Sequence, residues 1–378
     1  MLFRFSPSFM PPLAMLTVLG ACSIGGVPIA DAIAKETSFT ISEVARLNEP
    51  WAMTFLPDGS ALITEKSGAV FLWSEGKKVV PISGVPQPAY GGQGGLGDII
   101  HHPDFAKNQT VYLSWVEAVG SNKGAVVGRA KLIEKAGEAS FEDMEIIWRQ
   151  EPKVSGGGHF GHRLAFGPDR MLYISSGERQ KFDPSQDMNS NLGKIIRVTD
   201  TGETPKDNPF AGQGEIKGQI WSSGHRNPLG IAFDAKGRLW NTEMGPKGGD
   251  ELNLVKRAAN YGYPKASNGS HYSGIDIPDH ASEDGFEAPK AWWTPSISPG
   301  SLIIYSGNMF PELKGSALIG ALSGEALVRV KLDGEKATKA ESWGMETRIR
   351  EVEQGPDGAI WLLEDGENGR LMRLTPKG

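Results

Sequence analysis

The chain repeats one pattern of hydrophobic and polar positions along most of its length. Each copy is a short apolar strand, a turn containing Pro-Asp or Asp-x-x-Gly, and a second strand in which hydrophobic and polar residues alternate. The six copies begin at or near Pro50, Leu96, Arg163, Pro228, Ile303 and Ile349. Proline fixes φ and glycine accepts positive φ, so such turns reverse the chain tightly. The pattern predicts antiparallel β-hairpins from one end of the chain to the other.

Six units of this kind favour a six-bladed β-propeller. Four-stranded blades of about 55 residues, arranged radially, would use about 340 residues. A β-sandwich with several similar hairpins is the alternative, and it is less favoured because the units extend from end to end. Between Tyr263 and Pro299 the alternation is lost and Gly, Pro, Ser and Asp are frequent. We interpret this segment as a long loop that contributes to the mouth of a central cavity.

Composition and charge narrow the fold class and the kinds of binding partner further. The chain has 378 residues, 39% of them hydrophobic, with 49 Gly and 25 Pro. A chain of this length can form one large core. The many Gly and Pro residues make a helical bundle unfavourable and support an all-β fold. A formal net charge of -6 leaves no broad basic field. We therefore expect no nucleic-acid partner.

The N-terminus is typical of an exported protein. Arg4 precedes an apolar run, Leu13–Ala21, that is too short to span a bilayer. Ala32-Ile33-Ala34 resembles a signal-peptidase site, which predicts a signal peptide over residues 1–34 and a single propeller domain over residues 35–378.

The same region offers a second processing site. Leu19-Gly20-Ala21-Cys22 resembles a bacterial lipoprotein box, in which the signal would end at residue 21 and Cys22 would carry lipid as the only link to a membrane. The two alternatives remain open, and both predict a periplasmic or otherwise exported protein. Cys22 is the sole cysteine, so we expect no internal disulfide in the mature fold.

His159 is the leading candidate for a general base. It lies in the glycine-rich stretch SGGGHFGHRLAFGPD, just before a predicted strand. Small neighbours leave an imidazole open to a ligand, and an imidazole titrates near neutral pH. A structural, hydrogen-bonded histidine is the alternative, and the residue types alone leave it open.

Two arginine clusters predict an anionic ligand. Arg226 and Asn227, in SSGHRNPLGIAF, combine a guanidinium fork with an amide, which suits a carboxylate or an oxyanion. Arg348 and Arg350 are two positions apart, so on a strand both side chains project from one face and would meet a polyanion. For each cluster the alternative is a solvated surface turn.

A third cluster, TEMGPKGGDELN, predicts a calcium site. Gly245-Pro246 would expose backbone carbonyls, and Asp250 and Glu251 add carboxylates. Hard oxygen ligands suit Ca²⁺ better than Zn²⁺, and the sequence has no Cys or paired-His spacing typical of zinc. A surface turn is again the alternative.

Together these motifs resemble the glucose/sorbosone dehydrogenase family, in particular its soluble aldose sugar dehydrogenases that use pyrroloquinoline quinone (PQQ). The likeness runs from about Leu47 to Leu374. It includes, in order, GGQGGLGDIIHHPDF, GGGHFGHRLAFGPD, NLGKIIRVTDTG, GHRNPLGIAF, EMGPKGGDELN, NYGYP and TRIREVEQGPDG. The resemblance implies a PQQ- and Ca²⁺-dependent enzyme that oxidises aldose sugars to lactones by hydride transfer from the anomeric carbon, with an external electron acceptor.

The resemblance also implies roles for single residues. His159 matches the base that removes the proton from the anomeric hydroxyl, and Arg226 matches the arginine that polarises the quinone carbonyl. The positions that match cofactor contacts are Gln93, Arg226, Asn227, Tyr272, Arg348 and Arg350. The positions that match calcium ligands are the carbonyls of Gly245 and Pro246 for the catalytic ion, and Glu251 and Tyr261 for a further ion in the aldose dehydrogenase branch.

Two positions depart from the family pattern. Ser323 stands where relatives have a lysine that contacts the cofactor, so either the cofactor affinity or the alignment of this stretch differs. Glu178 stands where the glucose enzyme has the aspartate that orients the base. A longer carboxylate can still hydrogen-bond an imidazole.

Two other functions remain as alternatives. A metal-dependent lactonase on a six-bladed propeller would keep calcium but hydrolyse an ester, and the paired arginines would then lack a purpose. A non-catalytic propeller that binds carbohydrate is the second alternative, and the serine at position 323 favours it.

Overall fold

The computed structural model describes residues 39–77 and 79–377, and almost all regular structure in them is β-sheet. The all-β prediction is therefore confirmed. The predicted signal peptide, both processing sites and Cys22 lie outside the described residues. Within the described part, no helix has the length and hydrophobicity to cross a membrane.

The six predicted hairpins are all present as antiparallel strand pairs. The first strands are β2 (Pro50–Phe55), β6 (Leu96–His101), β10 (Gly161–Phe166), β14 (Pro228–Phe233), β18 (Pro299–Ile304) and β22 (Ile349–Gln354). Their partners are β3 (Ala61–Glu65), β7 (Thr110–Val119), β11 (Leu172–Ser176), β15 (Leu239–Glu243), β19 (Ala317–Ala321) and β23 (Ile360–Glu364). The fifth hairpin begins at Pro299, a few residues before the predicted Ile303.

Further strands extend these hairpins into sheets of four. The third and fourth strands are β4 (Val70–Trp73), β5 (Val80–Ser83), β8 (Asn122–Lys135), β9 (Glu138–Arg149), β12 (Lys194–Val198), β13 (Ile220–Ser223), β16 (Asp250–Val255), β17 (Ala291–Trp293), β20 (Ala326–Asp333), β21 (Lys336–Gly344) and β24 (Gly369–Pro376). Strands β2 to β5 form the first group of four and β6 to β9 the second, and parallel pairing of β5 with β9 joins these two groups into one sheet of eight strands. The last group is completed by the N-terminal β1 (Phe39–Leu47), which pairs with β24.

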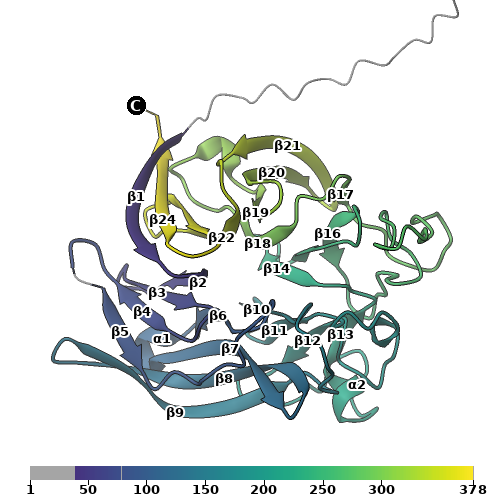
Figure 1. Cartoon of the computed structure of the whole chain (residues 1–378), viewed down its shortest axis with the longest axis horizontal. Coiled ribbons are helices and arrows are strands. Elements are labelled where there is room, and N and C mark those ends of the chain that lie inside the picture. Colours follow the sequence, from purple (N-terminus) through teal and green to yellow (C-terminus); the bar gives the residue numbers. More distant parts are fainter. Residues whose placement is uncertain (1–38, 78, 378) are drawn as a thin grey trace, which may run out of the picture. The chain divides into compact units, whose positions relative to one another are not determined.

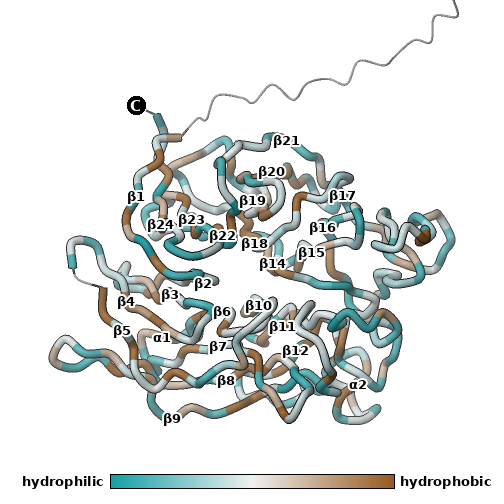
Figure 2. The backbone as a smooth tube through the Cα atoms, in the orientation of Figure 1, coloured by the Kyte–Doolittle hydropathy of each residue, from teal (hydrophilic) through white to brown (hydrophobic). Residues whose placement is uncertain are grey.

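Helical structure is confined to short turns between strands. They are α1 (Phe105–Asn108), α2 (Glu215–Gln219) and the 3-10 turns η1 (Asp183–Ser185) and η2 (Pro311–Leu313). The hydrophobic core lies between neighbouring sheets, where side chains such as Val127, Leu164 and Ile196 pack together. Figure 2 shows hydrophobic segments along the strands and hydrophilic segments in many of the connecting loops.

The six first strands lie around the centre of the view in Figure 1. Each contacts the next along the chain, and β22 contacts β2. Near the start of every one of them the register with its partner shifts at a β-bulge. A bulged residue is left out of the hydrogen-bond ladder, so its carbonyl and side chain are available for other contacts.

The guanidinium of Arg163, on β10, uses three of these available carbonyls. It donates to the carbonyl oxygens of Leu229 on β14 at 2.9 Å, Gly300 on β18 at 2.6 Å and Arg350 on β22 at 3.4 Å. Arg163 itself is buried. One side chain therefore ties its own strand to three others.

The same guanidinium also contacts the remaining two first strands. It lies 3.4 Å from the carboxylate of Asp98 on β6, and its carbon lies 4.1 Å from the ring centroid of Trp51 on β2. The carboxyl group of Glu351 on β22 lies 2.5 Å away; burial raises its pKa well above the usual value, and the charge of Arg163 acts against that rise. All six first strands thus meet at Arg163.

Arg163→Met is expected to lower the free energy of unfolding by about 3 to 5 kcal/mol, because it leaves two buried carboxylates and their neighbouring carbonyls without a cationic partner. Urea unfolding followed by tryptophan fluorescence measures this loss. Arg46→Met is the matched control, since Arg46 and Glu43 form a pair with side chains 46% and 43% exposed. Exposed pairs contribute at most about 1 kcal/mol. Equal losses in the two variants would contradict the central role of Arg163.

Candidate active site

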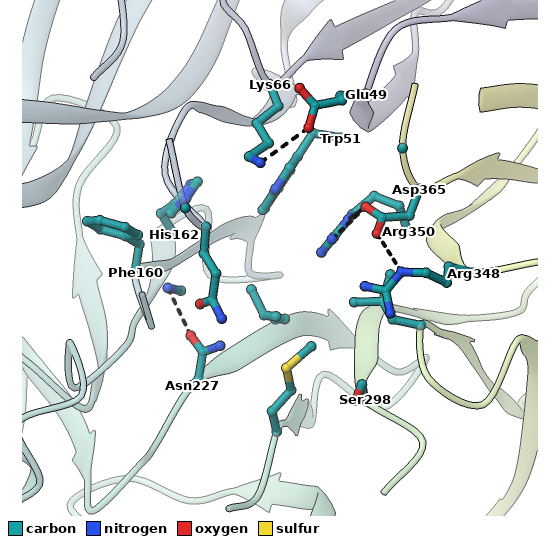
Figure 3. Close-up of a pocket in the computed structure, with 17 residues that line it drawn as sticks. Glu49, Trp51, Lys66, Phe160, His162, Asn227, Ser298, Arg348, Arg350 and Asp365 are labelled. Atoms are coloured by element: carbon teal, nitrogen blue, oxygen red, sulfur yellow. Dashed lines mark hydrogen bonds and ion pairs between the residues drawn. The ribbon is translucent and has the colours of Figure 1, made fainter. Parts of the chain in front are cut away.

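Two adjoining cavities open where the first strands begin. The first has a volume of about 390 Å³ and is lined by Arg348 and Arg350; we call it the arginine cavity (Figure 3). The second has a volume of about 830 Å³ and is lined by His159 and Arg226; we call it the histidine cavity. Gln93 lines both, as do Met244 and Ser298, so the two cavities form one concave site.

Most of the residues predicted from the sequence lie at this site. Those in the histidine cavity are Gln93, His159, Arg226, Gly245, Pro246, Asp250 and Tyr272. Those in the arginine cavity are Gln93, Asn227, Arg348 and Arg350. Glu178 reaches the site through its contact with His159, whereas Glu251 and Tyr261 line neither cavity.

His159 is held from two sides. Its backbone, at φ 51°, donates its N–H to Oε1 of Gln93 at 2.7 Å, and its Nδ1 hydrogen-bonds the Glu178 carboxylate. Because a carboxylate only accepts, Nδ1 carries the proton and Nε2 keeps a lone pair. Burial lowers the pKa of His159 below its usual value, and the positive charge of Arg226 lowers it further. The hydrogen bond to Glu178 raises it and so opposes both effects. A neutral imidazole with a free Nε2 is suited to accept a proton.

Glu178 orients His159 and also fixes the following loop. Its second oxygen accepts the backbone N–H groups of Lys181 at 2.5 Å and Phe182 at 2.7 Å. Burial alone would raise the pKa of this carboxyl, but the hydrogen bonds from His159 and Phe182 and the charge of Arg226 hold the pKa below its usual value. Glu178 is therefore ionised at neutral pH and keeps the His159 ring in one orientation.

Arg226 and Asn227 present hydrogen-bond donors that lack protein acceptors. Arg226 Nη1 donates to the carbonyls of Met244 at 2.9 Å and Gly245 at 2.5 Å, but its buried Nε has no acceptor among the described residues. The Asn227 side chain accepts from Gly161 N–H at 3.2 Å, and its buried Nδ2 likewise has no acceptor in the described part of the chain. Unpaired buried donors are unfavourable, so this site fits a ligand rich in oxygen acceptors.

Arg348 and Arg350 both bind Asp365, as expected for two side chains on one face. Arg348 Nε lies 2.8 Å from Asp365 Oδ2, and Arg350 Nη2 lies 2.7 Å from Oδ1. Burial would raise the pKa of Asp365, but both arginines hold it below its usual value. The sequence did not reveal Asp365, because it lies just after β23 in a turn without any marked motif.

The carboxylate of Asp250, predicted as a possible calcium ligand, lies at the histidine cavity and is engaged by backbone amides. Its carboxylate accepts backbone N–H groups of Gly245 at 2.9 Å, Ile297 at 2.7 Å and Ser298 at 2.6 Å. Asp250 therefore fastens two loops that line the histidine cavity. In residues 39–77 and 79–377, no group of three or more His, Cys, Asp or Glu side chains is arranged to hold a metal. A cation beside Gly245 and Pro246 would depend on backbone carbonyls.

Glu251 and Tyr261 lie in a separate buried cluster. Glu251 accepts from Asn253 Nδ2 at 3.0 Å, and its other oxygen lies 3.8 Å from His280 Nε2. Burial raises the pKa of Glu251 well above its usual value, and the charge of Glu243 raises it further. The Tyr261 hydroxyl is engaged by Leu254 and Lys256, so this residue could offer a cation only its backbone carbonyl.

Three further residues of the arginine cavity were not predicted as site residues. Trp51 stacks on His162 with ring centroids 5.0 Å apart, and His162 Nδ1 lies 2.8 Å from Ser114 Oγ. Burial lowers the pKa of His162 to about 3, so this ring stays neutral. Lys66 is the third, and it lies in a turn that the sequence pattern marks as an ordinary hairpin connection.

Comparisons with known proteins bear on this site. A family model described as Glucose / Sorbosone dehydrogenase matches residues 47–373. The chain is 38% identical over 340 residues to aldose sugar dehydrogenase YliI of Escherichia coli (strain K12), a match that covers 88% of this chain and 91% of that protein.

Solved structures agree with the sequence matches. The soluble aldose sugar dehydrogenase of Escherichia coli in its apo-form superposes with a TM-score of 0.85 at 36% identity, covering 90% of this chain and 100% of that chain. The PQQ-bound aldose sugar dehydrogenase of Streptomyces coelicolor gives a TM-score of 0.74 at 30% identity, and the match covers 90% of this chain and 98% of that chain. The chain belongs to the glucose/sorbosone dehydrogenase family.

Glu178→Gln is expected to lower the pKa of His159 further, because the variant loses the negative charge that favours the imidazolium. The measurement is an NMR titration of ¹³C-labelled histidine, with the His159 signal assigned by its absence in His159→Asn. Glu151→Gln serves as the control, since Glu151 is 45% exposed and does not contact His159. An unchanged or raised His159 pKa in Glu178→Gln would refute the assigned pairing.

Proposed function

We propose that this protein is a PQQ- and calcium-dependent aldose sugar dehydrogenase that oxidises the anomeric carbon of the sugar to a lactone. The observation that carries the proposal is the His159–Glu178 pair, which leaves a neutral imidazole nitrogen at a cavity that also presents unpaired donors from Arg226 and Asn227. Family membership supports the same reaction, since the relatives described above bear the name aldose sugar dehydrogenase.

The fold that we propose for this enzyme is a six-bladed β-propeller with one catalytic domain over residues 35–378. Its support is the cycle of contacts among the six first strands and their common contact with Arg163. In a propeller, the first strand of each blade faces the central channel. The candidate site would then lie at one mouth of that channel.

The cavity residues fit PQQ by their chemistry. Arg348 and Arg350 would hold carboxylates of the cofactor, and Gln93, Asn227 and Tyr272 would contact its ring system. The unpaired Nε of Arg226 suits a quinone oxygen, where a fixed positive charge stabilises developing negative charge. When bound, PQQ supplies the acceptor for the hydride that leaves the anomeric carbon.

The roles of the protein side chains follow from this arrangement. His159 Nε2 accepts the proton of the anomeric hydroxyl, so that the C1–O bond gains double-bond character as the hydride leaves. Glu178 stabilises the imidazolium that forms and keeps its ring in place. The products are the lactone and the reduced cofactor, from which an external electron acceptor removes the electrons.

For calcium we propose the carbonyls of Gly245 and Pro246, which line the same cavity as His159. The Gly245 carbonyl already accepts from Arg226, so a cation would use its second lone pair. A second ion at Glu251 and the Tyr261 carbonyl would relieve the unfavourable burial of the Glu251 charge. A cation beside the quinone acts as a Lewis acid.

We further propose that the protein is exported to the periplasm, on the basis of the apolar run Leu13–Ala21 and its flanking processing sites. Intact-mass analysis of the mature protein distinguishes a free chain that begins near Lys35 from one that carries lipid on Cys22.

Reconstitution tests the function directly. Purified protein is incubated with Ca²⁺ and PQQ, and dye reduction is followed after an aldose such as glucose is added. Activity is expected only when both additions are present, and a chelator that removes Ca²⁺ should abolish it. Dye reduction without PQQ, or none with it, would refute the proposal. Ester hydrolysis without dye reduction would instead support a lactonase.

His159→Asn is expected to reduce kcat by at least about a hundredfold, because general-base catalysis contributes roughly 10² to 10⁴. Asparagine tolerates the positive φ of this position, so the backbone should be retained. His101→Asn is the control, since His101 lies at the end of β6 and lines neither cavity. A His159→Asn enzyme with wild-type kcat would exclude His159 as the base.

A further inference from the structure

Lys66 lines the arginine cavity from a different side than Arg348 and Arg350 (Figure 3). It follows β3, in the turn that leads to β4, and its side chain is 20% exposed. The only hydrogen-bond acceptor of its ammonium group among the described residues is Glu49, with Nζ and Oε1 3.4 Å apart. An ammonium group has three donors, so most of its bonding capacity is available to a ligand.

The backbone of Lys66 is fixed even though its ammonium group is not. Its N–H donates to the carbonyl of Glu49 at 3.0 Å, and its carbonyl accepts from Leu96 N–H at 2.9 Å. Gly95 packs so closely that an added Cβ would lie 2.2 Å from the Lys66 carbonyl oxygen. The turn between β1 and β2, the first residue of β6 and a glycine contact therefore set where the lysine side chain enters the cavity.

Glu49 and Tyr90 form the rim beside this ammonium group. The Tyr90 hydroxyl donates to Glu49 at 2.5 Å, and Lys66 Nζ lies 5.3 Å from the centroid of the Tyr90 ring. The long Lys66–Glu49 separation is that of a weak, partly solvated ion pair. A ligand carboxylate inside the cavity would offer Lys66 a better acceptor than Glu49 does.

The charges that line the arginine cavity favour a polyanion over a single carboxylate. Three cations, Lys66, Arg348 and Arg350, face two carboxylates, those of Glu49 and Asp365. The two arginines share Asp365 on one side, and Lys66 has Glu49 on another. A planar ligand with carboxylates on separate edges can engage both groups of cations at once.

We infer that Lys66 binds a carboxylate of the quinone cofactor and supplies, from the β3–β4 turn, the positive charge that Ser323 lacks. The inference rests on the proposed function. Ser323 has no charge to offer, and its hydroxyl is engaged with the Ser296 carbonyl at 3.2 Å and Ser298 Oγ at 2.7 Å. Cofactor affinity would thus be maintained by a cation from a different part of the fold.

Direct binding of PQQ tests the inference without relying on turnover. The dissociation constant is measured by quenching of tryptophan fluorescence at fixed Ca²⁺ concentration, for wild type and for Lys66→Met. A charge-assisted hydrogen bond to a partly exposed ammonium predicts about tenfold weaker binding in Lys66→Met. Lys66→Arg should stay within about threefold of wild type, since it keeps the charge. Lys236→Met is the control, because Lys236 is an exposed turn residue between β14 and β15 that lines neither cavity.

Glu49→Gln provides an independent second measurement. Removing the carboxylate that competes for Lys66 is expected to tighten PQQ binding by a few-fold. This variant also decides the matter if Lys66→Met does not fold, in which case unchanged or weaker binding by Glu49→Gln overturns the inference. A wild type that binds PQQ, together with a folded Lys66→Met that binds it equally well, overturns the role of Lys66 and leaves the proposed function intact. A wild type that binds no PQQ overturns both.

Discussion

The buried guanidinium of Arg163 is the contact on which the candidate site depends. A buried charge is tolerated only when carboxylates and carbonyls surround it, so Arg163 fits only after the strands carrying Asp98, Leu229, Gly300 and Glu351 have come together. Those strands begin with the cavity residues. His159 precedes β10, Arg226 and Asn227 precede β14, Arg348 directly precedes β22, and Arg350 is the second residue of β22. The interaction that assembles the centre of the fold therefore also sets the distances within the site.

The polar groups of the site are of two kinds. Most charged side chains are held in place by protein partners, whereas some hydrogen-bond donors remain available to a ligand. Glu178 binds His159 and two backbone amides, and Asp365 holds two arginines together. Arg226 Nε and Asn227 Nδ2 have no acceptor among the described residues. Such preorganisation avoids rearrangement when a ligand binds, and it favours ligands whose acceptors match the fixed donors.

The hairpins, the all-β class and most of the cavity loop between Tyr263 and Pro299 could be predicted because their signals are local: alternation, turn residues and loss of periodicity. The short strand β17 within that loop was missed. His159, Arg226, Arg348 and Arg350 were found because their motifs are distinctive in sequence. Asp365, Glu49 and Lys66 were not, because each lies in a turn or bend without a distinctive motif. Asp250 was selected for its carboxylate, but its backbone partners at Ile297 and Ser298 could not be recognised from its own motif.

The pairing of β1 with β24 has a consequence for how the chain can fold. Phe39 lies opposite Pro376, so β1 is made early but has no partner strand until β24 has been made. Contacts of such long range form slowly, and until this one forms β1 presents an unpaired edge. Until β24 has been made, the hydrogen-bonding edge of β1 would be open to strands of other molecules, which makes early aggregation a hazard of this arrangement.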